Sequence, residues 1–199
     1  SSSRVYSINN LRRLKKNKFL VNEKFDTSGP KSLYGFSKYS SEHLIKEFSF
    51  FYKIKYIINR LGVISGPWQF GKQDQGFVSL WVWKHINRKK LSYIGFGGKG
   101  LQIRDVLHIT DVCKLITKQI KKMNSINNLT LNVGGGSKNT ISLKGLTKIC
   151  QKITSNKIKI FSEKNTSEYD IPYYVTNNSK VNKIYNWYPQ KRVFNIIKD

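Results

Sequence analysis

The sequence contains no alanine, and cysteine, proline and acidic residues are scarce. Its two cysteines, Cys113 and Cys150, lie far apart in apolar helical patterns, so we expect two ordinary buried thiols and neither a disulfide framework nor a metal cluster. No apolar run approaches the ~20 residues that a membrane helix needs. The segment Ser1-Ser2-Ser3-Arg4 lacks the apolar core of a signal peptide. A cytoplasmic protein with no membrane partner and no metal is therefore predicted.

The scarcity of Asp and Glu leaves a net charge of +25, from 36 basic and 11 acidic residues. Taken alone, this charge is typical of proteins that bind nucleic acid or anionic membranes. The lysines are spread evenly, however, with 7, 7, 7 and 8 in successive quarters of the chain, so no basic patch stands out. Abundant Lys, Asn and Ile without Ala are typical of an AT-rich genome. We therefore predict no nucleic-acid partner, and a basic polyanion-binding module stays open as the non-enzyme alternative.

Strand-like and helix-like patterns alternate along the chain, which favours an α/β fold with a largely parallel sheet. Residues 7–33 are polar and rich in turn formers, and they predict a long loop. Residues 54–64 are rich in β-branched side chains and predict a buried strand. A helix is predicted from Leu33 to about Tyr52, with an apolar stripe formed by Leu33, Phe36, Leu44, Ile45, Phe48 and Phe51. Further helices are predicted at 77–87, 111–123 and 142–153, and further strands at 91–96, 106–109, 129–133 and 158–161.

Tyr34 and Lys38 are the first residues in the chain whose spacing indicates chemistry. They lie four positions apart at the start of the predicted helix, so both side chains project from one face. A nearby ammonium favours the phenolate of a tyrosine, which then becomes a general acid/base for converting a hydroxyl to a carbonyl. The spacing alone is a weak signal, because such pairs arise by chance in many Lys-rich helices.

The segments around this pair follow an order that is similar to one family. Upstream lies a serine-bearing segment, and downstream lie a strand, a turn and an Arg-Asp segment. In order, these are Ser1-Ser2-Ser3-Arg4-Val5-Tyr6, Tyr34-Gly-Phe-Ser-Lys38, Asn59-Arg60-Leu61-Gly62-Val63, Gly66-Pro67, Gln102 to Asp111, Asp170-Ile171-Pro172 and Asn178-Ser179-Lys180. The chain thereby resembles the extended short-chain dehydrogenase/reductases, the family of NAD-dependent nucleotide-sugar epimerases and dehydratases.

The resemblance implies the C-terminal part of a Rossmann-like α/β fold with a small α/β substrate-binding domain. Residues 1–66 would belong to the NAD-binding domain and 67–199 mainly to the nucleotide-sugar-binding domain, with 101–115 and 128–140 returning toward the Rossmann-like core. The family begins with a strand, a glycine-rich turn and a helix that bind NAD. We expect roughly the first third to be missing here, so that the chain alone would not hold NAD and could be an inactive fragment.

The resemblance also implies a role for each residue that matches a family motif. Ser2 would hold the reacting sugar hydroxyl, Tyr34 would be the acid/base, and Lys38 would position the nicotinamide ribose and tune Tyr34. The cofactor would also face Leu61, Gly62 and Val63. The nucleotide side of the substrate would be lined by Gln75, Gly76, Tyr93 and Arg104, with the planar guanidinium of Arg104 on the diphosphate.

Two longer stretches narrow the expected substrate. Residues 66–78 and 92–100 are most similar to the branch of the family that epimerises CDP-linked hexoses, so a CDP-hexose is predicted. A 4-epimerase or a 4,6-dehydratase remains an alternative, because both use the same Tyr and Lys. Dehydratases usually carry an acidic pair beside the catalytic serine, where this chain has Ser3-Arg4. The family also predicts a homo-oligomer that packs through the helix of Tyr34.

Some features depart from the family or imitate its motifs. Ser7 replaces a glycine, and Ser167 stands where many relatives carry an Arg on the diphosphate. The stretch Gly95 to Gly100 matches GxGxxG, but no helix is predicted after it to face a pyrophosphate. Gly134-Gly135-Gly136 lacks the spacing of that motif, and we predict structural turns at both places. The three histidines lack ligand spacing, and none is predicted to be catalytic.

Overall fold

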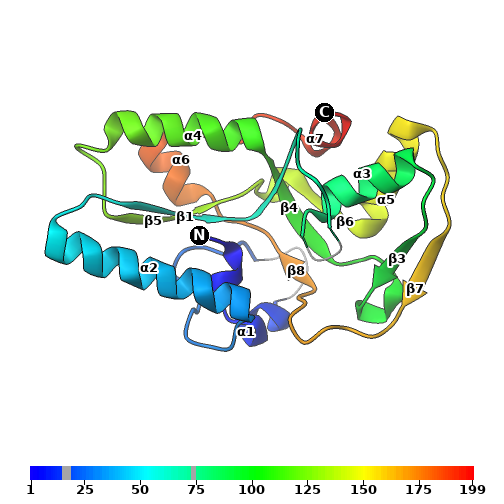
Figure 1. Ribbon diagram of the computed structural model, residues 1–199, viewed down its shortest axis with the longest axis horizontal. Coiled ribbons are helices and arrows are strands. Elements are labelled where there is room, and N and C mark those ends of the chain that lie inside the picture. The colour runs from blue at the N-terminus through cyan, green and yellow to red at the C-terminus, as the bar shows by residue number, and fades with distance from the viewer. Residues whose placement is uncertain (15–18, 73–74) are drawn as a thin grey trace.

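A computed structural model describes residues 1–14, 19–72 and 75–199. Figure 1 shows helices on either side of short, mainly parallel strands. The strands are β1 (Ile57–Leu61), β2 (Val63–Ser65), β3 (Leu91–Ile94), β4 (Ile103–His108), β5 (Leu129–Val133), β6 (Thr140–Ser142), β7 (Ile160–Glu163) and β8 (Tyr173–Tyr174). The helices are α1 (Ile8–Arg13), α2 (Leu33–Tyr52), α3 (Phe77–Ile86), α4 (Ile109–Lys122), α5 (Leu143–Thr154), α6 (Ser179–Tyr185) and α7 (Val193–Lys198).

Parallel pairing dominates the strands, as the alternating pattern predicts. Within the described residues, the pairs β1–β5, β2–β4, β3–β7 and β4–β8 are parallel, and the pair β4–β6 is antiparallel. The predicted strand 54–64 is divided at Gly62, whose amide donates to the Val133 carbonyl over 2.9 Å. β1 therefore pairs with β5 before the division, and β2 pairs with β4 after it.

Among the residues that the structure describes, the buried hydrophobic side chains form three clusters. One packs α4 and α6 against β1 and β5 and includes Leu115 and Leu131. A second lies among α3, α5 and α7 around Trp81 and Leu146. The third joins the N-terminal segment, through Tyr6, to residues near β8. The second cluster supports β3 and β7, whereas the other two support the region around β1 and α2.

Helix α2 has the predicted bounds, but its apolar stripe faces solvent rather than a core. The helix begins after Ser32, whose hydroxyl accepts a hydrogen bond from the Gly35 amide, and ends at Lys53 in the left-handed conformation. Its buried residues are Gly35 and Glu42. The six predicted stripe residues are between 44% and 86% exposed. The predicted stripe is present on the helix, and it is exposed because no described element covers this face.

The structure corrects several other predictions. The predicted loop 7–33 contains α1, which begins after Ser7, whose hydroxyl accepts from the Asn10 amide; residues 15–18 lie outside the described residues. Cys113 is exposed on α4, although Cys150 is buried as expected and burial raises its pKa to about 12. The short elements β6, β8, α6 and α7 were not predicted, because their two to seven residues are too few for a clear periodicity.

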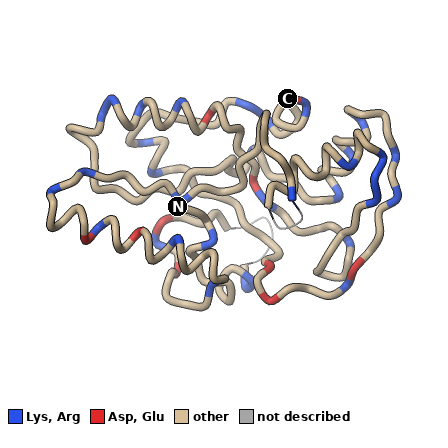
Figure 2. Tube along the Cα trace, viewed as in Figure 1, with Lys and Arg blue, Asp and Glu red and all other residues tan. Residues whose placement is uncertain are grey.

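Two further findings concern membrane-spanning helices and metal-binding groups among the described residues. Within the described ranges, none of the helices combines the length and apolar character needed to span a membrane. The same residues contain no group of three or more His, Cys, Asp or Glu side chains placed to hold a metal ion. Figure 2 shows Lys and Arg distributed along the whole trace, in agreement with their even spacing in the sequence.

Candidate functional site

Tyr34 and Lys38 lie together on the first two turns of α2. The Lys38 Nζ atom is 5.6 Å from the centre of the Tyr34 ring, and Tyr34 is 47% exposed. Between them, Gly35 lies directly against the chain that follows Ser2. A Cβ atom at Gly35 would be 2.2 Å from the Arg4 carbonyl oxygen, so any larger residue would push these segments apart. Glycine at this position therefore sets how closely α2 approaches the serine segment.

Ser2 is held between α2 and the end of β1. It precedes the 3₁₀ turn η1 (Ser3–Val5), and its hydroxyl accepts a hydrogen bond from the Arg4 amide over 3.2 Å. Ser2 also forms an isolated parallel bridge with Leu61, where the Leu61 amide donates to the Ser1 carbonyl. The structure thus brings the serine segment to the strand end at Leu61 and to the first turn of α2.

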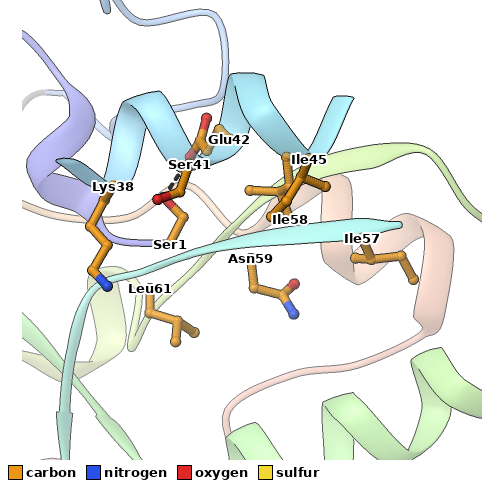
Figure 3. A pocket seen from close by; sticks show the side chains of 9 residues that line it. All are labelled: Ser1, Lys38, Ser41, Glu42, Ile45, Ile57, Ile58, Asn59 and Leu61. Atoms are coloured by element: carbon orange, nitrogen blue, oxygen red, sulfur yellow. Dashed lines mark hydrogen bonds between the residues drawn. The ribbon is translucent and has the colours of Figure 1, made fainter. Parts of the chain in front are cut away.

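A pocket of about 320 Å³ lies between α2 and β1 (Figure 3). Lys38 and Glu42 line it from α2, and Asn59 and Leu61 line it from β1. Figure 3 shows the Lys38 side chain extending from α2 toward β1 near Leu61. Lys38, Leu61 and the serine segment, predicted from different motifs, therefore border the same space.

A buried ion pair that the sequence analysis did not identify fixes α2 to β1. Arg60 donates to both carboxylate oxygens of Glu42, with Nη2 to Oε2 at 2.7 Å and Nε to Oε1 at 2.9 Å. The Ser1 hydroxyl donates to Oε1 at 2.6 Å. Arg60 Nη1 also donates to the Tyr6 hydroxyl, which in turn donates to Asn132. The signal was present in the sequence, because Glu42 follows Lys38 by one more helical turn.

Burial and hydrogen bonding have opposite effects on the pKa of Glu42. Burial by itself raises the pKa of a carboxyl group, because it penalises the charged form. Hydrogen bonds from Arg60 and Ser1 outweigh burial and lower the pKa of Glu42 below its ordinary value. Glu42 is therefore a charged structural anchor one turn beyond Lys38.

The predicted nucleotide-side residues occupy separate elements. Gly76 precedes α3 with φ of 70°, a conformation that favours glycine, and Gln75 beside it is exposed. Gln73 and Asp74 of the same predicted stretch lie outside the described residues. The Tyr93 hydroxyl donates to Thr147 Oγ1 over 2.8 Å, and the Tyr93 ring stacks with Trp81. The structure places Tyr93 against α3 and α5, and it does not bring Tyr93 into contact with Tyr34.

Arg104 lies on β4 with its side chain 13% exposed. Its Nη2 atom donates to Asp170 Oδ1 over 3.0 Å and to the Ile171 carbonyl over 2.7 Å. Burial lowers the pKa of Arg104 to about 10, although Asp170 opposes this shift. Arg104, which the resemblance places on the diphosphate, is therefore paired with Asp170 of the same chain.

Gly62 and Gly134 permit a close approach of backbone around buried Asp105. A Cβ atom at Gly134 would be 2.1 Å from Thr176 Oγ1 and 2.5 Å from Asp105 Oδ2. Burial raises the pKa of Asp105, although the Gly136 and Thr176 amides donate to its carboxyl group. Gly134 to Gly136 is therefore a tightly packed structural turn, as predicted. Gly62 belongs to the same packing arrangement, while Val63 begins β2 beside it.

The described residues could hold the nicotinamide and its ribose better than the pyrophosphate of NAD. Lys38 and Leu61 line the α2–β1 pocket, and Tyr34 lies beside Lys38 on α2, so ammonium, apolar and hydroxyl groups could hold a ribose and nicotinamide there. The stretch Gly95 to Gly100 forms a 3₁₀ turn and continues into β4. Gly134 to Gly136 continues into the short turn Ser137–Asn139. Neither glycine-rich stretch precedes a helix that could face a pyrophosphate.

Comparison with known proteins identifies the family. Residues 1–134 match the NAD dependent epimerase/dehydratase family, and the chain belongs to that family. Its relatives with known names are enzymes that act on sugar nucleotides, and the cofactor of the family is NAD. The predicted family, enzyme class and cofactor are therefore confirmed.

Individual relatives differ in the sugar nucleotide named. CDP-paratose 2-epimerase of Salmonella typhi is 26% identical over 161 residues, which cover 80% of this chain and 47% of that protein. dTDP-glucose 4,6-dehydratase of Escherichia coli is 27% identical over 171 residues, covering 81% of this chain and 45% of the relative. The chain spans about half the length of these relatives. Similarity at this level does not fix the substrate.

A solved structure confirms the fold. UDP-glucuronic acid 4-epimerase from Bacillus cereus, in complex with UDP-glucuronic acid and NAD, superposes with a TM-score of 0.81. The match covers 100% of this chain and 57% of that one at 20% identity. The prediction of an α/β, Rossmann-like extended short-chain dehydrogenase/reductase fold is confirmed.

Proposed function

We propose that Ser2, Tyr34 and Lys38 are the acid/base group of an NAD-dependent nucleotide-sugar epimerase, and that its reaction is inversion at C2 of CDP-paratose. One observation carries the proposal: Lys38 lies 5.6 Å from the Tyr34 ring on α2, and the Arg4 carbonyl of the Ser2 segment abuts Gly35 between them. The assignment of CDP-paratose rests on the similarity to CDP-paratose 2-epimerase and on the stretches at 66–78 and 92–100.

The proposed roles follow from the chemistry of the side chains. Tyr34, as phenolate, accepts the proton of the sugar hydroxyl, and the Lys38 ammonium stabilises that phenolate. The Ser2 hydroxyl holds the reacting oxygen by a hydrogen bond. NAD, held beside Lys38 and Leu61, would supply a reversible hydride acceptor for the sugar carbon, which would allow inversion there. Tyr34 then returns its proton to the oxygen, and the net reaction consumes no reductant.

The remaining predicted contacts complete the proposal. Gly62 and Val63 would border the nicotinamide beside Leu61, and Gln75, Gly76 and Tyr93 would border the nucleotide. The exposed apolar face of α2 supports a homo-oligomer, because large exposed apolar patches are typical of protein interfaces. The cytoplasmic location remains a prediction from the sequence.

The experiment is a chimaera in which the N-terminal NAD-binding segment of CDP-paratose 2-epimerase is joined to Ser1. Incubation with CDP-paratose followed by sugar analysis should show the C2-inverted product. Tyr34→Phe should lower kcat by about 10²-fold or more, because it removes the proton acceptor. A chimaera that binds NAD but produces no inversion would overturn the proposal, and so would undiminished activity of Tyr34→Phe.

A 4-epimerase or 4,6-dehydratase is the second candidate, supported by the similarity to dTDP-glucose 4,6-dehydratase. Against dehydration stands Ser3-Arg4 beside Ser2, because neither side chain is an acid that could protonate a leaving hydroxyl. The same chimaera incubated with UDP-glucose or dTDP-glucose separates these reactions by product. A polyanion-binding module predicts instead a steep loss of nucleic-acid binding as salt rises.

A further inference from the structure

Acidic residues are absent from two long stretches of the chain, 75–104 and 112–162, which together contain 16 lysines and arginines. Helices α3 and α5 and strand β3 fall within these stretches, and so does most of β7. α3 and α5 share one buried cluster, against which residues of β3 and β7 also pack. Although the lysines are evenly spaced in the sequence, this part of the fold therefore carries positive charge with few acidic neighbours.

The pairing of β3 with β7 brings lysines from two distant segments side by side. Leu91 pairs with Ile160, and the Leu91 amide donates to the Lys159 carbonyl over 3.3 Å. Lys90 and Lys159 therefore enter the two strands next to each other. Their Nζ atoms lie 5.8 Å and 5.0 Å from the centre of the same ring, that of Phe161. We call the five basic residues at this end of the two strands the basic surface: Arg88, Lys89, Lys90, Lys157 and Lys159.

The basic surface keeps its charge free for an external anion. All five side chains are exposed. Among the residues that the structure describes, no ion pair joins any of them to a carboxylate. The Arg88 Nε atom donates to the neutral side chain of Asn156 over 3.0 Å. Glu163 lies at the other end of β7, where it pairs with Ile94. Figure 2 shows the resulting basic stretches side by side along the edge where β3 and β7 run.

Exposed apolar side chains lie beside the basic surface. Trp83 and Ile86, three positions apart on the last turns of α3, are 52% and 58% exposed. The Lys89 amide donates to the Lys84 carbonyl over 2.8 Å, so the run from Arg88 to Lys90 folds back against the end of the helix. The surface therefore combines cations with an aromatic and an aliphatic side chain that face solvent.

This combination fits an anionic lipid bilayer better than a nucleic acid. Lysines near a membrane surface are attracted to anionic head groups, and Trp side chains favour the interface between head groups and acyl chains. Ile86 offers an aliphatic contact for acyl chains, whereas it has no ring on which a base could stack. The ring of Phe161 already lies beneath two ammonium groups.

We propose that the basic surface, together with Trp83 and Ile86, docks the protein peripherally on a bilayer that contains anionic phospholipids. The sequence predicted no membrane partner from its short apolar runs and evenly spaced lysines. Peripheral docking needs no spanning helix, and the fold gathers the lysines. Figure 1 shows α2 and β1 toward the opposite end of the molecule from β3 and β7, so docking leaves the α2–β1 pocket accessible. The proposal does not depend on the reaction assigned to that pocket.

The test is co-sedimentation of the 199-residue chain with two kinds of vesicle, phosphatidylcholine alone and equal parts phosphatidylcholine and phosphatidylglycerol. The chain should bind the anionic vesicles, and the bound fraction should fall as sodium chloride is raised. Lys89→Gln/Lys90→Gln/Lys159→Gln should weaken binding about tenfold or more, because each lysine near an anionic surface contributes about fivefold. Trp83→Ser/Ile86→Ser should weaken binding while the dependence on salt remains.

The matched control is Lys114→Gln/Lys121→Gln/Lys122→Gln, which removes three exposed lysines of α4 and changes the net charge equally. It should weaken vesicle binding less than about twofold, because salt screens charges far from the docked surface. Circular dichroism spectra should show that every variant is folded. Equal weakening by the two triple variants would overturn the proposal, as would absence of binding to the anionic vesicles. Tighter binding of a single-stranded oligonucleotide that is lost in the β3–β7 triple variant would also overturn it, since the surface would then serve a nucleic acid.

Discussion

Arg60 and Arg104 are both largely buried, but their environments differ. The Arg60 and Glu42 side chains are 6% and 1% exposed, and Arg60 also binds Tyr6. At Arg104 the side chain is 13% exposed and its partner Asp170 is 30% exposed. Burial is the largest single influence on the pKa of each arginine. Glu42 and Tyr6 nevertheless raise the pKa of Arg60, whereas the pKa of Arg104 falls to about 10. We call Arg60–Glu42 the closed pair and Arg104–Asp170 the open pair. The partners of Arg60 outweigh its burial, whereas the burial of Arg104 outweighs its partner.

The largest expected effect comes from breaking the closed pair. Glu42→Leu leaves the Arg60 charge buried without a partner, and we expect a loss of about 3–5 kcal/mol in the free energy of unfolding. Urea unfolding measures this loss. The double variant Glu42→Leu/Arg60→Met should recover most of it, and Glu47→Leu on the exposed face of α2 should stay within about 0.5 kcal/mol. If Glu42→Leu lowered the free energy of unfolding only slightly, the pair of Arg60 would not stabilise the fold more than that of Arg104.

Acid should weaken the same pair. The pKa of Glu42 is lower in the folded chain than its ordinary value of 4.5, so the unfolded state takes up protons first. The stability that this pair contributes is complete above that value and is lost as the pH falls through the lower folded pKa. Unfolding measured between pH 7 and pH 3 should show a weaker decline in Glu42→Gln than in the unsubstituted chain. Parallel declines in the two proteins would contradict this origin.

Gly35→Ala tests the close packing of α2 on the serine segment. The new methyl group would meet the Arg4 carbonyl oxygen, so α2 and η1 must separate. We expect a loss of about 1–3 kcal/mol in the free energy of unfolding, as for other overpacked sites. Thermal unfolding measures this loss. Ser40→Ala, at an exposed position of the same helix, serves as the control.

The smallest effect is expected at the open pair. Arg104→Met breaks a pair whose partner Asp170 is 30% exposed to solvent, so the free energy of unfolding should change by about 1 kcal/mol or less. Urea unfolding of this variant, set beside Glu42→Leu, compares the two regions directly. A loss as large as that of the closed pair would make Arg104 a structural residue instead.

The sequence predicted elements with long, regular patterns and missed contacts between distant segments. The bounds of α2 and β5 follow from periodicity and β-branched composition. The exposure of the α2 stripe could not be predicted, because periodicity indicates an apolar face without showing what covers it. Glu42 could have been found from its helical spacing to Lys38. The hydrogen bond from Arg4 to the Tyr169 carbonyl could not, because these residues are 165 positions apart and meet only in the folded chain.

The most direct test of the central claim is solvent deuterium at C2 of the product. In the proposed reaction Tyr34 exchanges only the hydroxyl proton, and the hydrogen on carbon returns as hydride. The chimaera working in D₂O should therefore invert CDP-paratose without deuterium at C2, as read by mass spectrometry and NMR, and Tyr34→Phe should abolish the inversion. Deuterium at C2 of the inverted product would show removal of a proton from carbon and would contradict the account.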